Sequence, residues 1–210
     1  SMGPTTKAMT VTGGVSFDEM IGHYRAQALG LLSGGADTLL LETTQDTRNL
    51  KAGLIGIEQA FAEVGWRTPV MVSVTIEPMG TMLAGQDVEA LYASVMHAPL
   101  LSVGINCATG PEFMTDHIRS LSALAKTLTS CYPNAGLPDA DGRYSETPES
   151  LSIELERFMK EGWVNIVGGC CGTTPAHIRA LAAAAAGKKP RRVPIHNKTL
   201  VSGIDLLEVD

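Results

Sequence analysis

The sequence predicts an α/β protein of the (β/α)8 TIM-barrel type, of which about the last five βα units are present. Short apolar segments rich in Leu, Val and Ile alternate with longer stretches of helical periodicity. Such continuous apolar segments are typical of parallel strands that are covered on both faces. The polar residues that close these segments recur about every 30 residues, which is the size of one βα unit. A doubly wound open sheet shares these features and stays as the alternative.

Five segments have the strand pattern, and the fourth is the weakest of them. They are residues 38–41, 70–74, 100–105, 127–132 and 164–167. Helical periodicity fills the intervals and stops near Gly or Pro. The expected helices cover residues 48–65, 88–97, 111–125, 147–162 and 175–186. A further helix over residues 16–32 precedes the first strand, and Ser16 with Glu19 has the pattern of a capping box.

The two ends of the chain carry different signals. Residues 1–4 resemble the end of one more strand, and residues 5–14 have the composition of a loop. After Gly187 the chain becomes basic and then predicts an extended, solvated connector. A complete barrel needs about 250 residues, so its first strands have no counterpart here. We therefore expect a partial barrel domain over residues 1–187 and a linker over residues 188–210.

Composition restricts the classes of function. The formal net charge is -6, and Lys and Arg cluster only at residues 188–192, which argues against a nucleic-acid partner. No apolar run approaches the roughly 18 residues of a membrane span, and the N-terminus lacks the pattern of a secretion signal. We expect a cytoplasmic protein without a membrane partner, in which the 4 cysteines stay reduced.

Chemically versatile residues gather at the ends of the predicted strands, where barrels carry their functional groups. These residues are Glu42, Thr75, Asn106, Cys107, Asn134, Cys170 and Cys171. Three cysteines on one rim favour Zn²⁺, since three protein ligands leave a fourth position for a substrate. The alternative is that they are small buried hydrophobic residues. Cys131 lies within a strand, so we assign it to packing.

The segment around the paired cysteines suits metal binding. Gly168, Gly169 and Gly172 allow backbone conformations that turn both thiols toward one ion. Thr173 or Thr174 can cap the helix that follows, and the positive end of this helix favours thiolates.

Three further residues at strand ends could contact a substrate. Glu42 enters a partly buried rim, where its carboxylate needs either a substrate group or a salt bridge within the protein. Asn106 and Asn134 could bind substrate or connect neighbouring loops. The histidines fall in helices or in the tail, so we assign them to surface or packing roles.

Two motifs resemble those of a known family. Gly-Gly-Cys-Cys-Gly-Thr at residues 168–173 and Gly-Ile-Asn-Cys-Ala at residues 104–108 resemble the homocysteine S-methyltransferase family, whose barrels bind zinc through three cysteines. Residues 3–5, 35–43 and 133–138 resemble most closely the homocysteine-binding domain of cobalamin-dependent methionine synthases. Residues 195–199 resemble the linker from that domain to a folate-binding domain.

The resemblance implies roles for individual residues. The implied zinc ligands are Cys107, Cys170 and Cys171. Glu42 would contact the amino group of homocysteine, and Asn106 would help to line its pocket. Asn134 would occupy the open zinc position when the substrate is absent.

The implied activity is methyl transfer to homocysteine, bound as a zinc thiolate, to give methionine. Methylcobalamin would be the donor, and it and methyltetrahydrofolate would lie on separate cobalamin- and folate-binding domains. Because the family's first strands have no counterpart here, we expect a partner or a complementing fragment to cover the open barrel. The alternatives are a stand-alone methyltransferase that uses betaine or S-methylmethionine, and a non-catalytic zinc-binding remnant.

Overall fold

A computed structural model describes residues 1–5, 9 and 13–209, and a parallel sheet of five strands lies at its centre. The strands of this sheet are β1 (Leu39–Thr44), β2 (Val70–Val74), β3 (Leu100–Asn106), β4 (Leu128–Tyr132) and β5 (Ile166–Val167). The helices are α1 (Phe17–Ser33), α2 (Thr47–Val64), α3 (Val88–Val95), α4 (Pro111–Leu124), α5 (Pro148–Lys160) and α6 (Pro175–Ala185). The predicted strands and helices are confirmed, including the weakest strand, β4. Among the described residues, no helix has the length and apolar character that crossing a membrane requires.

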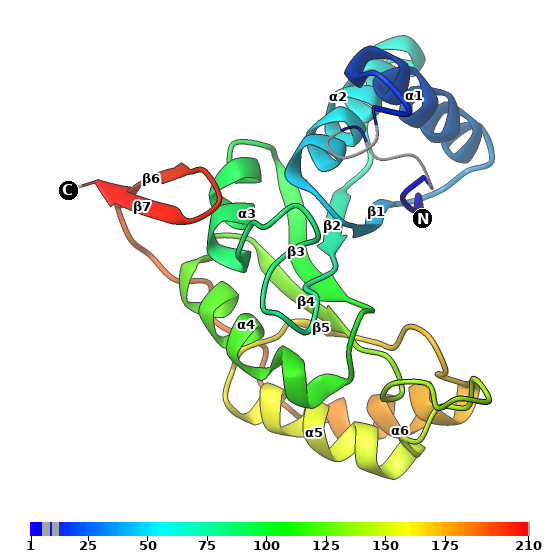
Figure 1. The fold of residues 1–210 in the computed structure, drawn as a ribbon, viewed down its shortest axis with the longest axis vertical. Helices are drawn as coiled ribbons and strands as arrows, with labels where there is room; N and C mark the ends of the chain where they lie inside the picture. Colours follow the sequence, from blue (N-terminus) through cyan, green and yellow to red (C-terminus); the bar gives the residue numbers. More distant parts are fainter. Residues whose placement is uncertain (6–8, 10–12, 210) are drawn as a thin grey trace.

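The order of the strands decides between the two fold classes. The strands follow one another as β1-β2-β3-β4-β5, and the helices form an arc around one side of the curved sheet (Figure 1). A doubly wound sheet would reverse its strand order and carry helices on both faces. The sequential order and one-sided helices are those of a (β/α) barrel, so the barrel prediction is confirmed for this part of the fold.

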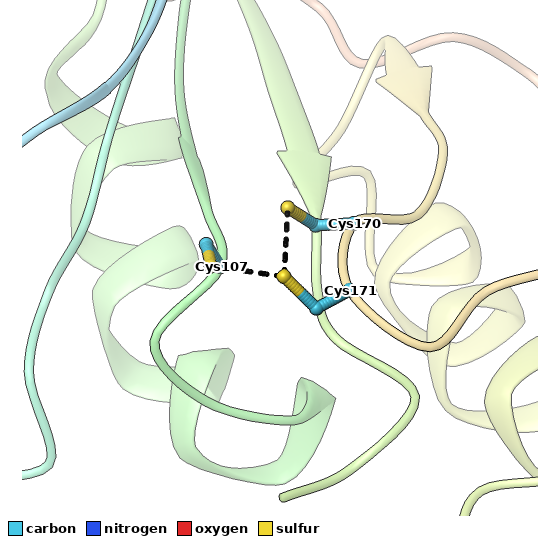
Figure 2. Close-up of side chains that lie close together, drawn as sticks. All are labelled: Cys107, Cys170 and Cys171. Atoms are coloured by element: carbon cyan, nitrogen blue, oxygen red, sulfur yellow. Dashed lines mark hydrogen bonds between the residues drawn. The ribbon is translucent and has the colours of Figure 1, made fainter. Parts of the chain in front are cut away.

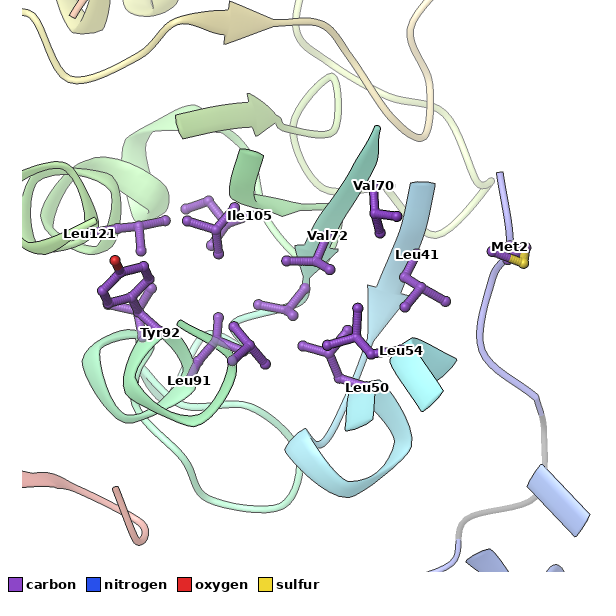
Figure 3. Packing of buried hydrophobic residues seen from close by; sticks show 14 of the residues in the cluster. Met2, Leu41, Leu50, Leu54, Val70, Val72, Leu91, Tyr92, Ile105 and Leu121 are labelled. Carbon is purple, nitrogen blue, oxygen red and sulfur yellow. The ribbon is translucent and has the colours of Figure 1, made fainter. Parts of the chain in front are cut away.

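The hydrophobic core fills the space between the sheet and this arc of helices. Val72 and Ile105 are fully buried and face Leu50, Leu91 and Leu121 of the helices (Figure 3). Because side chains alternate along a strand, the neighbouring residues point to the opposite face, which is the inside of the barrel. That alternation is what brings polar side chains to the inner surface.

The start of the chain is attached to the edge of the sheet. Met2 pairs with Leu41 in an isolated parallel bridge, with Met2 N donating to the Leu40 carbonyl at 2.8 Å. The expected strand end at residues 1–4 is thus in place beside β1, whereas most of the expected loop over residues 5–14 lies outside the described residues. The predicted capping box of α1 is confirmed, since Ser16 Oγ accepts from Glu19 N at 3.2 Å.

The tail differs from the prediction of an extended, solvated connector. Strands β6 (Thr199–Ser202) and β7 (Leu206–Val209) form an antiparallel hairpin, which is anchored near α3 by a hydrogen bond from Asp87 N to the Ile204 carbonyl at 3.2 Å. The basic run is not uniformly solvated either, because Arg191 is only 4% exposed. Both errors have the same reason: no local sequence pattern predicts the backbone pairing of the hairpin or the burial of Arg191. The role of residues 188–210 as a linker to a folate-binding domain stays a prediction.

Candidate metal centre

Three cysteines converge at the carboxyl end of the sheet. Cys107 directly follows β3, and Cys170 and Cys171 lie in the loop between β5 and α6. Their sulfur atoms all lie within 4.8 Å of one another, with 3.7 Å from Cys107 to Cys171 and 4.0 Å from Cys170 to Cys171 (Figure 2). Tetrahedral zinc with Zn–S bonds of about 2.3 Å places two sulfurs about 3.8 Å apart. The cluster therefore fits one zinc ion with little rearrangement.

A left-handed turn directs the first of these sulfurs inward. Cys107 and Ala108 have φ angles of 60° and 58°, a region that residues other than glycine seldom occupy. The turn is fixed at both ends, because Cys107 N donates to the Tyr132 carbonyl at 3.1 Å and Thr109 N donates to the Cys107 carbonyl at 2.6 Å. Strained backbone of this kind is concentrated at functional sites.

The paired cysteines are held by the segment that follows β4. Cys170 N donates to the Pro133 carbonyl at 2.8 Å, and Ala135 N donates to the Cys171 carbonyl at 2.9 Å. The side chain of Asn134 completes this contact, since its Oδ1 accepts from Cys171 N at 3.0 Å. Asn134 is buried, so its amide orients the cysteine loop from below the surface.

An aromatic ring packs on the other side of the same loop. Gly172 has a φ of 77°, and a Cβ atom there would lie 2.2 Å from Cγ of Tyr144. Only glycine therefore fits between the Cys171 backbone and this ring. The pKa of the Tyr144 hydroxyl is raised by loss of solvent and by the nearby Cys171 sulfur, so the phenol lies beside the cluster.

Two thiols of the cluster, Cys107 and Cys170, differ in acidity. A hydrogen bond with the Cys170 thiol, supported by those from Cys171 and Asn134, lowers the pKa of Cys107 to about 5. The same hydrogen bond and burial raise the pKa of Cys170. Of these two thiols, Cys107 is therefore the more acidic. Cys131 differs, because complete burial raises its pKa and its sulfur packs 3.7 Å from Met114 Sδ, which confirms its packing role.

The side chain of Asn106 points inside the barrel and bonds to three neighbours. Its Oδ1 accepts from Thr43 N at 3.1 Å and from Ser73 Oγ at 2.6 Å. Its Nδ2 donates to Thr43 Oγ1 at 2.8 Å and to Cys170 Sγ at 3.8 Å. The structure thus connects Asn106 both to the metal cluster and to the end of β1.

Glu42 lies at the end of β1, next to this network. Its backbone N donates to the Met2 carbonyl at 3.0 Å, and its side chain is partly buried. Tyr132 lies within its electrostatic reach: burial raises the pKa of the Tyr132 phenol, and the Glu42 carboxylate adds to that rise. Among the described residues, the carboxylate has no hydrogen-bond or ion-pair partner, so the alternative of an internal salt bridge is not observed.

A family comparison agrees with this geometry. The model of a family described as homocysteine S-methyltransferase matches residues 1–185. The chain belongs to the homocysteine S-methyltransferase family.

Two solved structures of a homocysteine methyltransferase share the fold. The apo form of MmuM from Escherichia coli aligns with a TM-score of 0.66 and 24% identity, over 87% of this chain and 61% of that one. Its metallated form aligns with a TM-score of 0.62 and 24% identity, over 80% of this chain and 52% of that one. This chain therefore spans less than two thirds of the length of MmuM. The closer likeness to cobalamin-dependent methionine synthases stays a prediction.

Several residues around this site are absent from the sequence-based prediction. Thr43, Ser73 and Tyr144 contact the predicted residues, yet they lie in ordinary strand or loop sequence. His177 is buried, in agreement with the predicted packing role, and it also caps α6: its Nδ1 accepts from Thr174 N at 3.1 Å, and its Nε2 lies 3.0 Å from the Glu146 carbonyl. The sequence does carry a signal for this cap, because His177 lies three residues after Thr174, which is the spacing of a capping box.

Proposed function

We propose that this chain binds homocysteine and activates its thiol on a zinc ion held by Cys107, Cys170 and Cys171. The observation that carries the proposal is the cluster of three sulfurs, whose spacing suits one zinc ion. Cys171 is exposed and the other two are partly exposed, so a small thiol can approach the cluster. Three protein ligands leave one tetrahedral position for it.

When bound, zinc supplies Lewis acidity that lowers the pKa of a thiol from about 8.5, so that the thiolate predominates at pH 7. The residues of the chain provide orientation. Asn134 and Asn106 fix the loop of the paired cysteines, Cys170 and Cys171. The carboxylate of Glu42, which has no partner in the part of the chain that the structure describes, suits the ammonium group of the amino acid, since a partly buried charge gains most from an opposite charge. We propose these contacts as the substrate-binding role of this rim.

The reaction would be a simple displacement. The substrate thiol loses its proton, and the sulfur lone pair attacks the methyl carbon of the donor. As the new S–C bond forms, the bond between methyl and donor breaks, and its electron pair stays with the donor. The product is methionine.

We propose methylcobalamin, carried on a separate domain and regenerated from methyltetrahydrofolate on another, as the donor. The support is the likeness of residues 133–138 and 195–199 to cobalamin-dependent methionine synthases. Betaine and S-methylmethionine are the alternative donors of a stand-alone enzyme. We expect methionine, measured by mass spectrometry, to form from homocysteine with methylcobalamin and not with the other two. Methionine from betaine or S-methylmethionine alone would reverse the choice of donor.

The first test is the zinc content of the purified 210-residue chain and of two single variants. Elemental mass spectrometry should give about one zinc per chain for the wild type and for Cys131→Ala. Cys171→Ala removes a ligand and should lose zinc, with an affinity at least about 100-fold lower. Equal zinc retention in both variants would contradict the ligand assignment.

A second measurement separates catalysis from mere metal binding. X-ray absorption at the zinc edge should change when homocysteine is added, because its sulfur replaces a lighter ligand. An unchanged spectrum in a chain that retains zinc would favour the non-catalytic remnant.

A further inference from the structure

The hydrogen-bonding capacity of Asn106 is already used within the protein. A side-chain amide offers two lone pairs on oxygen and two N–H groups. Thr43 N and Ser73 Oγ donate to the oxygen of the amide. Its two N–H groups donate to Thr43 Oγ1 and Cys170 Sγ. The residue is only 1% exposed. A substrate would therefore have to displace one of these partners to bind the amide.

One of these partners has a strained backbone. Thr43 is β-branched and has a φ of 58°, a conformation that such residues rarely adopt. Both its backbone N and its hydroxyl bond to the Asn106 amide, so this amide holds the turn in place. Glu42 directly precedes the turn, and the direction of its carboxylate therefore depends on Asn106.

Another partner of Asn106, Cys170, is a proposed metal ligand. Asn106 Nδ2 lies 3.8 Å from Cys170 Sγ, within the longer range of hydrogen bonds to sulfur. A donor to a ligand sulfur fixes its orientation, and such outer partners affect metal affinity nearly as much as ligands do. A single planar amide thus joins the proposed zinc ligand to the turn after Glu42.

We propose that Asn106 is a positioning residue that keeps a fixed separation between the Cys170 sulfur and the Glu42 carboxylate. This inference rests on the proposed function, in which the cysteines bind zinc and Glu42 binds the substrate's ammonium group. A fixed separation selects the length of the carbon chain between thiol and ammonium. Asn106 thereby favours homocysteine over cysteine, which is shorter by one methylene.

The test is Asn106→Asp, which keeps the shape and the acceptor oxygen but removes both N–H donors. Its matched control is Asn165→Asp, the same chemical change at the opposite end of the barrel, where Nδ2 donates to the Arg191 carbonyl at 2.9 Å. Zinc affinity, measured by competition with a chelator, should fall about 10- to 100-fold in Asn106→Asp only. The preference of the zinc-loaded chain for homocysteine over cysteine, about 10- to 200-fold for one methylene, should also decrease in that variant alone.

The outcomes separate this inference from the proposed function. If the wild type binds no zinc, the proposed function fails and the inference falls with it. If the wild type binds zinc and homocysteine, and Asn106→Asp changes neither affinity nor selectivity, the proposed function stands and the positioning role is overturned. Equal losses in both variants would also overturn it, because they would show a general structural effect.

A measurement on the wild type decides the case in which Asn106→Asp does not fold. The side-chain amide protons of Asn106 and Asn165 are followed by NMR while cadmium is added in place of zinc. A shift at Asn106 with Asn165 unchanged supports the contact with a metal ligand. No shift at Asn106 on binding of cadmium overturns it.

Discussion

The two ends of the parallel strands are built differently. At the carboxyl end, Thr43, Cys107 and Ala108 have positive φ angles and three thiols lie close together. At the amino end, the chain after α6 returns to the sheet and ties its polar groups together through Arg191 and Asn165. In barrels the first end carries function and the second stability. Here the carboxyl end has left-handed backbone at residues other than glycine, and the amino end has a buried arginine that donates to backbone carbonyls.

Arg191 shows how the amino end is stabilised. The last carbonyl groups of a helix lack partners within the helix and carry negative partial charge. The guanidinium of Arg191 donates to the Ser122, Ala125 and Thr127 carbonyls at 2.6 to 3.0 Å, at and just beyond the end of α4. Burial lowers its pKa, but an arginine keeps its charge at neutral pH. The tail is thus fastened to the barrel as a structural part of it.

The largest expected effect is on stability, through the hydrogen bonds of Arg191. Arg191→Ala should lower the free energy of unfolding by about 3 kcal/mol, because it leaves buried carbonyl groups without donors. Its neighbour Arg192 is exposed, so Arg192→Ala should change stability by less than about 0.5 kcal/mol. Urea denaturation measures both. Zinc affinity should be the same in the two variants, and a loss of zinc in Arg191→Ala would show that the two ends are not independent.

A smaller effect is expected from alanine at two glycines with left-handed backbone. Gly172 at the metal end has the Tyr144 ring against it, whereas Gly187 at the other end faces open space with a φ of 73°. Gly187→Ala should cost only the backbone term, about 1 kcal/mol. Gly172→Ala must also displace the ring and should cost about 2 kcal/mol in total. Denaturation curves of equal midpoint would mean that Tyr144 moves freely and does not pack on the cysteine loop.

The last prediction concerns the chemical reactivity of the wild-type chain. In the metal-free chain, iodoacetamide should alkylate Cys107 at a rate that follows its thiolate. Because its pKa is lowered to about 5, the thiolate persists above that pH and is lost as pH falls through it. Peptide mass spectrometry across pH gives the profile. Cys131, whose pKa burial raises, should stay unmodified throughout. A midpoint for Cys107 near its ordinary value of about 8.5 would contradict a hydrogen-bonded thiolate.

Much of the fold and of the candidate cluster could be predicted from local sequence. Strands such as β2 were predictable because strands covered on both faces are rich in apolar residues. The convergence of Cys107 with Cys170 followed from their places after such strands. The hairpin of β6 and β7 was missed because its strands have 4 residues each and are largely exposed, so burial leaves little pattern.

The sequence by itself determined the order of strands and helices, the rim on which the cysteines lie and the family to which they belong. Only the tertiary structure decided that the Asn106 amide bonds to Thr43 and Cys170, and that Arg191 is buried under α4. The physical reason is the separation of the contacting residues along the sequence. Periodicity records whether a residue faces a core, whereas these contacts depend on the alignment of strands and loops that lie 63 to 69 residues apart.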